Sequence, residues 1–293
     1  MNKYLQLFRL GNVVMGIVGV TVASFMASGT GIADHWTGLL VSAAVVFMFI
    51  SGGNALNDSI DAEIDKTAHP ERPVPSGRMT AAEARRVGTA MLAGSVAASL
   101  LTLDPVCISI VAVACVLMLA YELRLKQRGF VGNLAIAVLT GMTFLMGGAV
   151  VSNAEGNAVV AVMAMLVSVG REVSKDIEDM DSDEGRTTLP MRIGVRNAAA
   201  VACAFFIAGP ALSIAPMVWH TYGPLYYLVL VADALFLYCA YVVFSDAHKA
   251  QSTAKKAMMI ALLAFILGIA FRGPGNRAQG TDGFSTPRPC CRG

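Results

Sequence analysis

The chain has 293 residues, of which 56% are hydrophobic and 14% are charged, and its formal net charge is +2. Soluble domains carry about 25% charged residues, so this composition excludes an ordinary soluble globular protein. Long apolar runs separated by short polar loops instead predict an all-α bundle of membrane-spanning helices, because each crossing needs about 20 apolar residues.

Nine apolar segments predict nine spanning helices, at residues 10–29, 37–56, 84–103, 106–123, 133–152, 157–175, 197–218, 224–244 and 255–271. They place a membrane domain at residues 1–271. The first segment is favoured as a span over a cleaved signal peptide, since many further spans follow it. Residues 272–293 are rich in Gly, Pro and Arg and have no apolar period, so we expect a disordered tail there.

Basic residues alternate between the two sides of the predicted bundle. The hairpin loops at 29–36, 104–106, 153–156 and 219–223 contain no Lys or Arg, whereas the segments on the opposite side hold 18 of the 22 basic residues. The positive-inside rule therefore places the N-terminus and the basic loops in the cytoplasm of a multi-pass cell-membrane protein. The expected surroundings are membrane lipids, and the sequence indicates neither a nucleic-acid partner nor an obligate protein partner.

Two acidic stripes stand at the cytoplasmic ends of the second and sixth predicted spans. The first stripe occupies relative positions 0, 4, 7 and 11: Asn54, Asp58, Asp61 and Asp65. The second repeats this spacing: Glu172, Asp176, Asp179 and Asp183. Such positions share one face of an α-helix. Because the stripes are four spans apart, they suggest two repeated four-helix units.

Carboxylates three and four residues apart repel one another, and a low dielectric strengthens the repulsion. Lys175 and Arg171 cannot balance both stripes, whereas divalent cations can. Oxygen ligands suit Mg²⁺, which combines one or two carboxylates with substrate phosphates. We therefore predict a Mg²⁺–diphosphate site held by Asn54, Asp58, Asp61, Asp65, Asp176, Asp179 and Asp183, in which the six aspartates are catalytic. The alternative, two solvated acidic helix ends, is disfavoured because both stripes have the same spacing on the same side.

Basic residues beside the stripes fit a diphosphate group. Arg72 follows the first stripe in a loop that its prolines and Gly77 keep from being helical. The predicted diphosphate-binding residues are Arg72, Tyr121, Lys126, Arg171 and Lys175. The positive-inside rule alone also explains each of the four cations.

These residues resemble the UbiA superfamily of intramembrane prenyltransferases, over about residues 1–271. The segment from Asn57 to Asp65, with Asn54 one turn earlier, is similar to the first aspartate-rich motif of that superfamily, and the segment from Lys175 to Asp183 is similar to the second. Within the superfamily, the loop from Asp61 to Arg78 resembles that of the archaeal digeranylgeranylglyceryl phosphate synthases. His69 departs from this pattern, because those enzymes often have Asn there or next to it.

The resemblance implies nine helices around a central cavity that is capped by the cytoplasmic loops. It also implies Mg²⁺-dependent transfer of a geranylgeranyl group from geranylgeranyl diphosphate to the free hydroxyl of geranylgeranylglyceryl phosphate, with release of diphosphate. An aromatic or chlorophyll-type acceptor stays open, since the metal motifs are shared. A secondary transporter is disfavoured, because transporters bind near the membrane midplane. Asp233, inside the eighth predicted span, is left outside the site.

Overall fold

The computed structural model describes residues 2–180 and 187–271. Asp183 of the second acidic stripe and the predicted tail at 272–293 lie outside these residues. The described parts consist of helices joined by loops and contain no strand, which confirms the all-α prediction.

Nine helices in the described residues have 14 residues or more, and each overlaps one of the nine predicted segments: α2 (Leu10–Ser28), α3 (Trp36–Ile60), α5 (Ala81–Ser99), α6 (Pro105–Leu123), α7 (Phe130–Val150), α8 (Ala158–Glu178), α10 (Val195–Val218), α11 (Val229–Val242) and α12 (Ala247–Ala270). Three shorter α-helices are α1 (Lys3–Phe8), α4 (Asp65–Ala68) and α9 (Leu189–Ile193). Short 3₁₀ turns connect several of them: Gly29–His35, Leu100–Thr102, Leu125–Gln127, Glu155–Asn157 and Pro224–Leu228.

Seven stretches of the described residues are long and apolar enough to span a membrane. The first, Leu10–Ile60, contains both α2 and α3; its 51 residues would extend about 75 Å as helix, well beyond one bilayer core. Apolar side chains on the outside of the bundle, such as Val116 (67% exposed) and Leu230 (51% exposed), suit contact with lipid. The protein is thus a multi-pass membrane protein, and the number of crossings stays a prediction.

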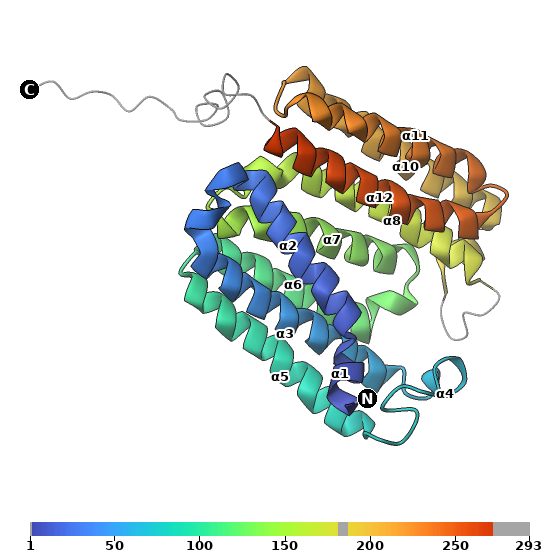
Figure 1. Cartoon of the computed structure of the whole chain (residues 1–293). Helices are drawn as coiled ribbons and strands as arrows, with labels where there is room; N and C mark the ends of the chain where they lie inside the picture. Colours follow the sequence, from blue (N-terminus) through green and yellow to red (C-terminus); the bar gives the residue numbers. More distant parts are fainter. Residues whose placement is uncertain (1, 181–186, 272–293) are drawn as a thin grey trace, which may run out of the picture.

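The helices pack side by side in chain order, with α3 along α5, α7 between α2 and α8, and α12 against α8 and α11 (Figure 1). Helices α3 and α5 approach each other closely at two glycines, Gly52 and Gly88. A Cβ at Gly88 would lie 2.9 Å from the Leu56 nitrogen and 3.0 Å from the Gly52 oxygen. Only residues without side chains fit here, and this contact fixes the end of α3 that carries the first acidic motif.

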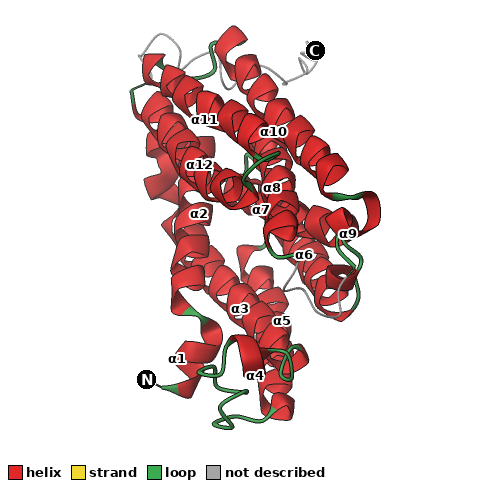
Figure 2. Cartoon of the chain, turned by 90° about the vertical axis from the view of Figure 1, so that its right-hand side faces the viewer, coloured by secondary structure: helices red, strands yellow, loops and turns green. Residues whose placement is uncertain are grey.

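Both motif helices end at the same point of their motifs. Helix α3 stops at Ile60, and Asp61 is its C-cap; helix α8 stops at Glu178, and Asp179 is its C-cap. The two carboxylates occupy the third position of their stripes, so this local geometry is repeated in the two motifs. The first stripe is not one continuous helix, because a turn separates Asp61 from Asp65, which begins α4. Helices α1 and α4 lie at the same end of the bundle (Figure 2).

We expect Gly88→Ala to lower the stability of the protein in detergent by about 1–3 kcal/mol, because the added methyl group meets backbone atoms that cannot move aside. Gly11→Ala is the matched control. Nothing lies within 4 Å of a Cβ at Gly11, and Ala is intrinsically better than Gly in a helix. Thermal unfolding of the two variants checks this, and equal midpoints would contradict the close α3–α5 contact.

Candidate functional site

The two acidic motifs meet at one polar cavity of about 600 Å³. Its walls come from the ends of α3, α6 and α8, the start of α7 and the loop after α4. Seven residues that were predicted from the sequence line it: Asn54, Asp61, Asp65, Arg72, Tyr121, Lys175 and Asp179. The fold therefore brings together residues that lie more than 100 positions apart in the chain.

Asp58 lies behind the cavity wall and is only 1% exposed. Its Oδ1 accepts a hydrogen bond from the Arg9 guanidinium and is 3.7 Å from Nη1 of Arg72. Arg72 in turn forms a 2.6 Å ion pair with Asp65. The two arginines thus attach the α1–α2 junction and the loop after α4 to the first motif.

A second group of contacts joins the end of α3 to the end of α6. Lys126 Nζ lies 2.7 Å from Asp61 Oδ1 and 3.0 Å from Glu122 Oε2. Asn57 donates from Nδ2 to Asp61 Oδ2 at 2.8 Å and, more weakly, to Glu122 at 3.4 Å. The Lys126 side chain is 3% exposed, so this ion pair is buried. Lys126 does not itself line the cavity, and it contacts Asp61, which does.

These contacts correct one step of the sequence argument. Divalent cations were inferred because Lys175 and Arg171 cannot neutralise the stripes. In the structure, three other cations, Arg9, Arg72 and Lys126, pair with the carboxylates of the first motif and with Glu122. Four carboxylates therefore face three cations, so most of the charge of the first motif is balanced by the protein itself.

The second motif is held differently. Asp176 accepts a 2.7 Å hydrogen bond from Asn133 at the start of α7. Arg171 pairs with its neighbour Glu172 and is not one of the residues lining the cavity. Lys175 lines the cavity and makes no side-chain hydrogen bond or ion pair within the described residues. Within the described residues, no ion pair of Lys175 would have to break for it to bind an anionic ligand.

Sequence reasoning missed five polar residues of this site: Arg9, Asn57, His69, Glu122 and Asn133. A usable signal existed for Glu122, which lies four residues before Lys126 and so shares its helix face. Arg9 was counted only as a cytoplasmic charge. Its backbone is left-handed at φ 51°, at the break between α1 and α2, and no pattern in the sequence indicates that break.

The residues present fit a hard divalent cation. They supply carboxylate and amide oxygens, and Oδ2 of Asp58 is buried without a hydrogen-bond partner. Within residues 2–180 and 187–271, no three His, Cys, Asp or Glu side chains converge in the manner of a preformed metal site. The donor set is therefore suitable, and its carboxylates are now partly engaged by Arg9, Arg72 and Lys126.

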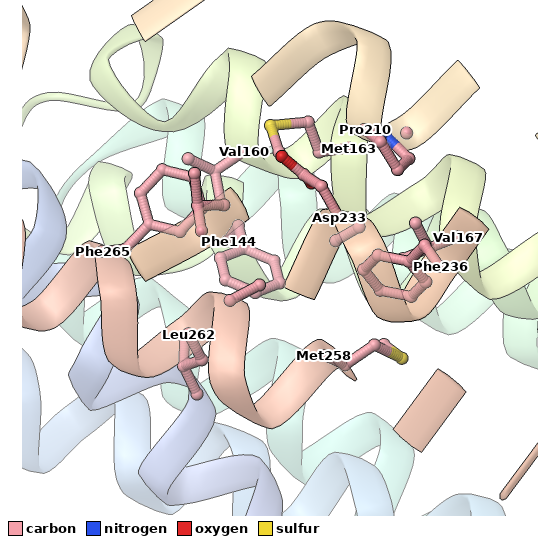
Figure 3. A pocket seen from close by; sticks show the side chains of 14 residues that line it. Phe144, Val160, Met163, Val167, Pro210, Asp233, Phe236, Met258, Leu262 and Phe265 are labelled. Carbon is pink, nitrogen blue, oxygen red and sulfur yellow. The ribbon is translucent and has the colours of Figure 1, made fainter. Parts of the chain in front are cut away.

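Asp233 lines a separate apolar pocket of about 60 Å³ between α7, α8, α10, α11 and α12 (Figure 3). Its neighbours there include Met163, Pro210 and Phe236. Ser213 donates a 2.6 Å hydrogen bond to Asp233 Oδ2. This pocket shares no lining residue with the polar cavity, so Asp233 lies outside the candidate site, as the sequence argument placed it.

The chain matches the model of the UbiA prenyltransferase family over residues 17–269. It belongs to that family, and it is a membrane prenyltransferase. The resemblance seen in the two aspartate motifs is thereby confirmed.

Named relatives narrow the comparison. A digeranylgeranylglyceryl phosphate synthase of Thermococcus kodakarensis is 37% identical over 280 residues, which cover 92% of this chain and 99% of that protein. The digeranylgeranylglyceryl phosphate synthase of Methanococcoides burtonii is 34% identical, and the match covers 92% of this chain and 100% of that protein. A solved structure concerning digeranylgeranylglyceryl phosphate synthase in membranes has a TM-score of 0.81 at 29% identity. The match covers 92% of this chain and 98% of that one. A UbiA homologue from Archaeoglobus fulgidus bound to DMAPP and Mg²⁺ shares the fold, with a TM-score of 0.64 at 14% identity. The match covers 92% of this chain and 98% of that one.

We expect Lys126→Met to cost roughly 3 kcal/mol or more of stability, because it leaves two buried carboxylates, Asp61 and Glu122, without their shared cation. Lys66→Met is the matched control, since its ion pair with Glu63 is largely exposed and worth under about 1 kcal/mol. Thermal unfolding in detergent measures both. Similar losses in the two variants would mean that the Lys126 ion pair is not effectively buried.

Proposed function

We propose that this protein transfers the geranylgeranyl group of geranylgeranyl diphosphate to the free hydroxyl of geranylgeranylglyceryl phosphate. The named relatives support this choice of substrates, since they match nearly the whole length of the chain. The observation that carries it is the single cavity in which Asp61 and Asp65 of the first motif and Lys175 and Asp179 of the second are brought together. An aromatic or chlorophyll-type acceptor is the alternative.

The proposed reaction breaks the allylic C–O bond of the donor, so that diphosphate leaves. An ether bond then forms to the acceptor oxygen, and the hydroxyl proton is released. Arg9, Arg72 and Lys175 line the cavity and stabilise the negative charge that develops on the leaving diphosphate. Lys126 contributes from behind Asp61. Apolar residues on the inner wall, among them Ile50 and Met118, keep water from the allylic cation and so limit its hydrolysis.

Magnesium is the proposed cofactor, and when bound it would neutralise the diphosphate further. Support comes from the Mg²⁺ in the related structure from Archaeoglobus fulgidus. The proposed ligands are those predicted from the sequence: Asn54, Asp58, Asp61, Asp65, Asp176, Asp179 and Asp183. Arg9 and Arg72, which pair with Asp58 and Asp65, lie beside these proposed ligands.

We also propose nine crossings that include two repeated four-helix units, with the N-terminus and the motif loops in the cytoplasm. The matching C-caps at Asp61 and Asp179 support the repeat. The distribution of Lys and Arg supports the orientation. We propose further that the membrane domain comprises residues 1–271.

The direct test is an assay of membranes with radiolabelled geranylgeranyl diphosphate and geranylgeranylglyceryl phosphate. We expect a dietherglycerol phosphate product that is lost when EDTA removes divalent metal and restored by Mg²⁺. Sealed inverted vesicles should be active and right-side-out vesicles silent until permeabilised, because the charged substrates cannot cross the bilayer. Product formation with an aromatic acceptor but not with the glyceryl phosphate would overturn the proposed acceptor.

Lys175→Met tests the site without disturbing an ion pair. We expect kcat/KM for the prenyl diphosphate to fall about 10- to 100-fold, the worth of one charge-assisted contact. The unfolding midpoint should stay unchanged, since Lys175 has no partner in the described residues. Lys256→Met, an exposed lysine on α12, is the control. Wild-type kcat/KM in the Lys175 variant would remove this residue from the diphosphate site.

A further inference from the structure

Glu178, the last residue of α8, carries a charge that the functional argument above does not use. It precedes the C-cap Asp179 and is not one of the residues lining the polar cavity. Counted from Glu172, it occupies relative position 6, which lies roughly 100° or more around the helix from the stripe at positions 0, 4 and 7. The equivalent residue of the first motif, at the end of α3, is the apolar Ile60. The carboxylate of Glu178 therefore has no counterpart in the first motif.

Both carboxylate oxygens of Glu178 contact α12, which packs along α8 (Figure 1). Oε1 lies 2.5 Å from Nδ1 of His248, and Oε2 accepts a 3.0 Å hydrogen bond from Nε2 of Gln251. His248 and Gln251 are three residues apart, so they share one face of α12. We call Glu178, His248 and Gln251 together the clamp.

The Gln251 side of the clamp is buried. Gln251 is 9% exposed, and its Oε1 is buried without a hydrogen-bond partner within the described residues. A buried amide oxygen left unpaired costs free energy, so the bond from Nε2 to Glu178 is what favours a polar side chain here. Ala250 and Ala254 of α12 belong to the same buried apolar cluster as Val173 of α8. This packing fixes the part of α12 from which the clamp reaches α8.

The clamp acts on the turn of α8 that carries two cavity residues. Lys175 and Asp179 both line the cavity, and the backbone nitrogen of Asp179 donates a 2.9 Å hydrogen bond to the carbonyl oxygen of Lys175. Glu178 lies in this same turn. Helix ends fray easily, and fraying here would separate Glu178 from α12 and displace Lys175 and Asp179 in the cavity.

We propose that Glu178 is a positioning residue for prenyl transfer: held by His248 and Gln251, it fixes the last turn of α8 so that Lys175 and Asp179 face the diphosphate. This inference rests on the proposed function and adds the contact that orients the second motif. Since Glu178 does not line the cavity, its effect passes through Lys175 and Asp179. A displacement of about 1 Å in a reacting geometry can lower a rate about 100-fold.

Two substitutions of Glu178 test the clamp. Glu178→Ala removes it, whereas Glu178→Gln keeps its shape with an amide that can bond to both partners. We expect kcat/KM for geranylgeranyl diphosphate to fall about tenfold or more in Glu178→Ala, as when other groups that orient a site are lost, and to stay within about threefold of wild type in Glu178→Gln. Wild-type kcat/KM in Glu178→Ala, or equal losses in the two variants, would overturn the proposal.

A binding measurement separates positioning from general stability. Inorganic pyrophosphate with Mg²⁺ should raise the unfolding midpoint of Glu178→Ala less than that of the wild type. Without ligand the two midpoints should differ little, because the Glu178 side chain is 26% exposed and its partner His248 is 71% exposed. A pyrophosphate-induced shift as large in Glu178→Ala as in the wild type would contradict positioning of the diphosphate site.

An exchange of the two groups tests the contact itself, even if Glu178→Ala fails to fold. Gln251→Glu sets two carboxylates against each other and should lower kcat/KM about tenfold or more. Combining it with Glu178→Gln restores one carboxylate and one amide, so most of the loss should be recovered. Ser245→Glu, at an exposed position before α12, adds the same charge outside the clamp and is the control. No recovery in the double variant would overturn the clamp.

Failure of the clamp and failure of the proposed function give different results. If the wild-type protein transfers no geranylgeranyl group to the glyceryl phosphate acceptor, the proposed function fails. The pyrophosphate-induced shifts of the Glu178 variants would still measure whether the clamp orients an anion site.

Discussion

Carboxylates buried at one end of a membrane bundle are the constraint on which the rest of this structure depends. Asp58, Asp61, Asp65 and Glu122 are each 8% exposed or less. Charges removed from water in this way are tolerated only when they are paired and hydrogen-bonded. Arg9, Arg72 and Lys126 provide the pairing, and each reaches the first motif from a different segment of the chain. The same ion pairs therefore balance the charge of the site and hold the surrounding segments against it.

The same pairing explains how a site can be both assembled and ready for an anion. The cations balance the first motif, and they are the groups that a diphosphate would attract. The second motif has contacts of its own. Asp176 is held by the neutral Asn133, and Lys175 makes no ion pair in the described residues. The two halves of the cavity repeat a spacing of residues, and in each half a residue from another segment holds a carboxylate of the motif.

Much of this arrangement could be predicted because it depends on local pattern. Apolar runs predict a helix in each of the nine segments where the structure has one, and the repeated spacing of the two motifs predicts that they share one site. The contacts of Arg9 could not be predicted, because they require a left-handed residue between α1 and α2 and the docking of that junction on α3. Asn133 is a single polar residue in the otherwise apolar first turn of α7. Its hydrogen bond to Asp176 depends on how α7 packs against α8, which no local pattern indicates.

The C-caps at Asp61 and Asp179 have one more consequence. Both motif helices direct their carboxyl ends to the cavity, so their macrodipoles add partial negative charge there. Many phosphate sites use the opposite end, where free backbone N–H groups and the positive pole of a helix bind the anion. That arrangement is reversed at these two helices. An anion in this cavity must be held by side-chain cations or metal ions against an unfavourable backbone field, and its departure after the reaction is correspondingly favoured.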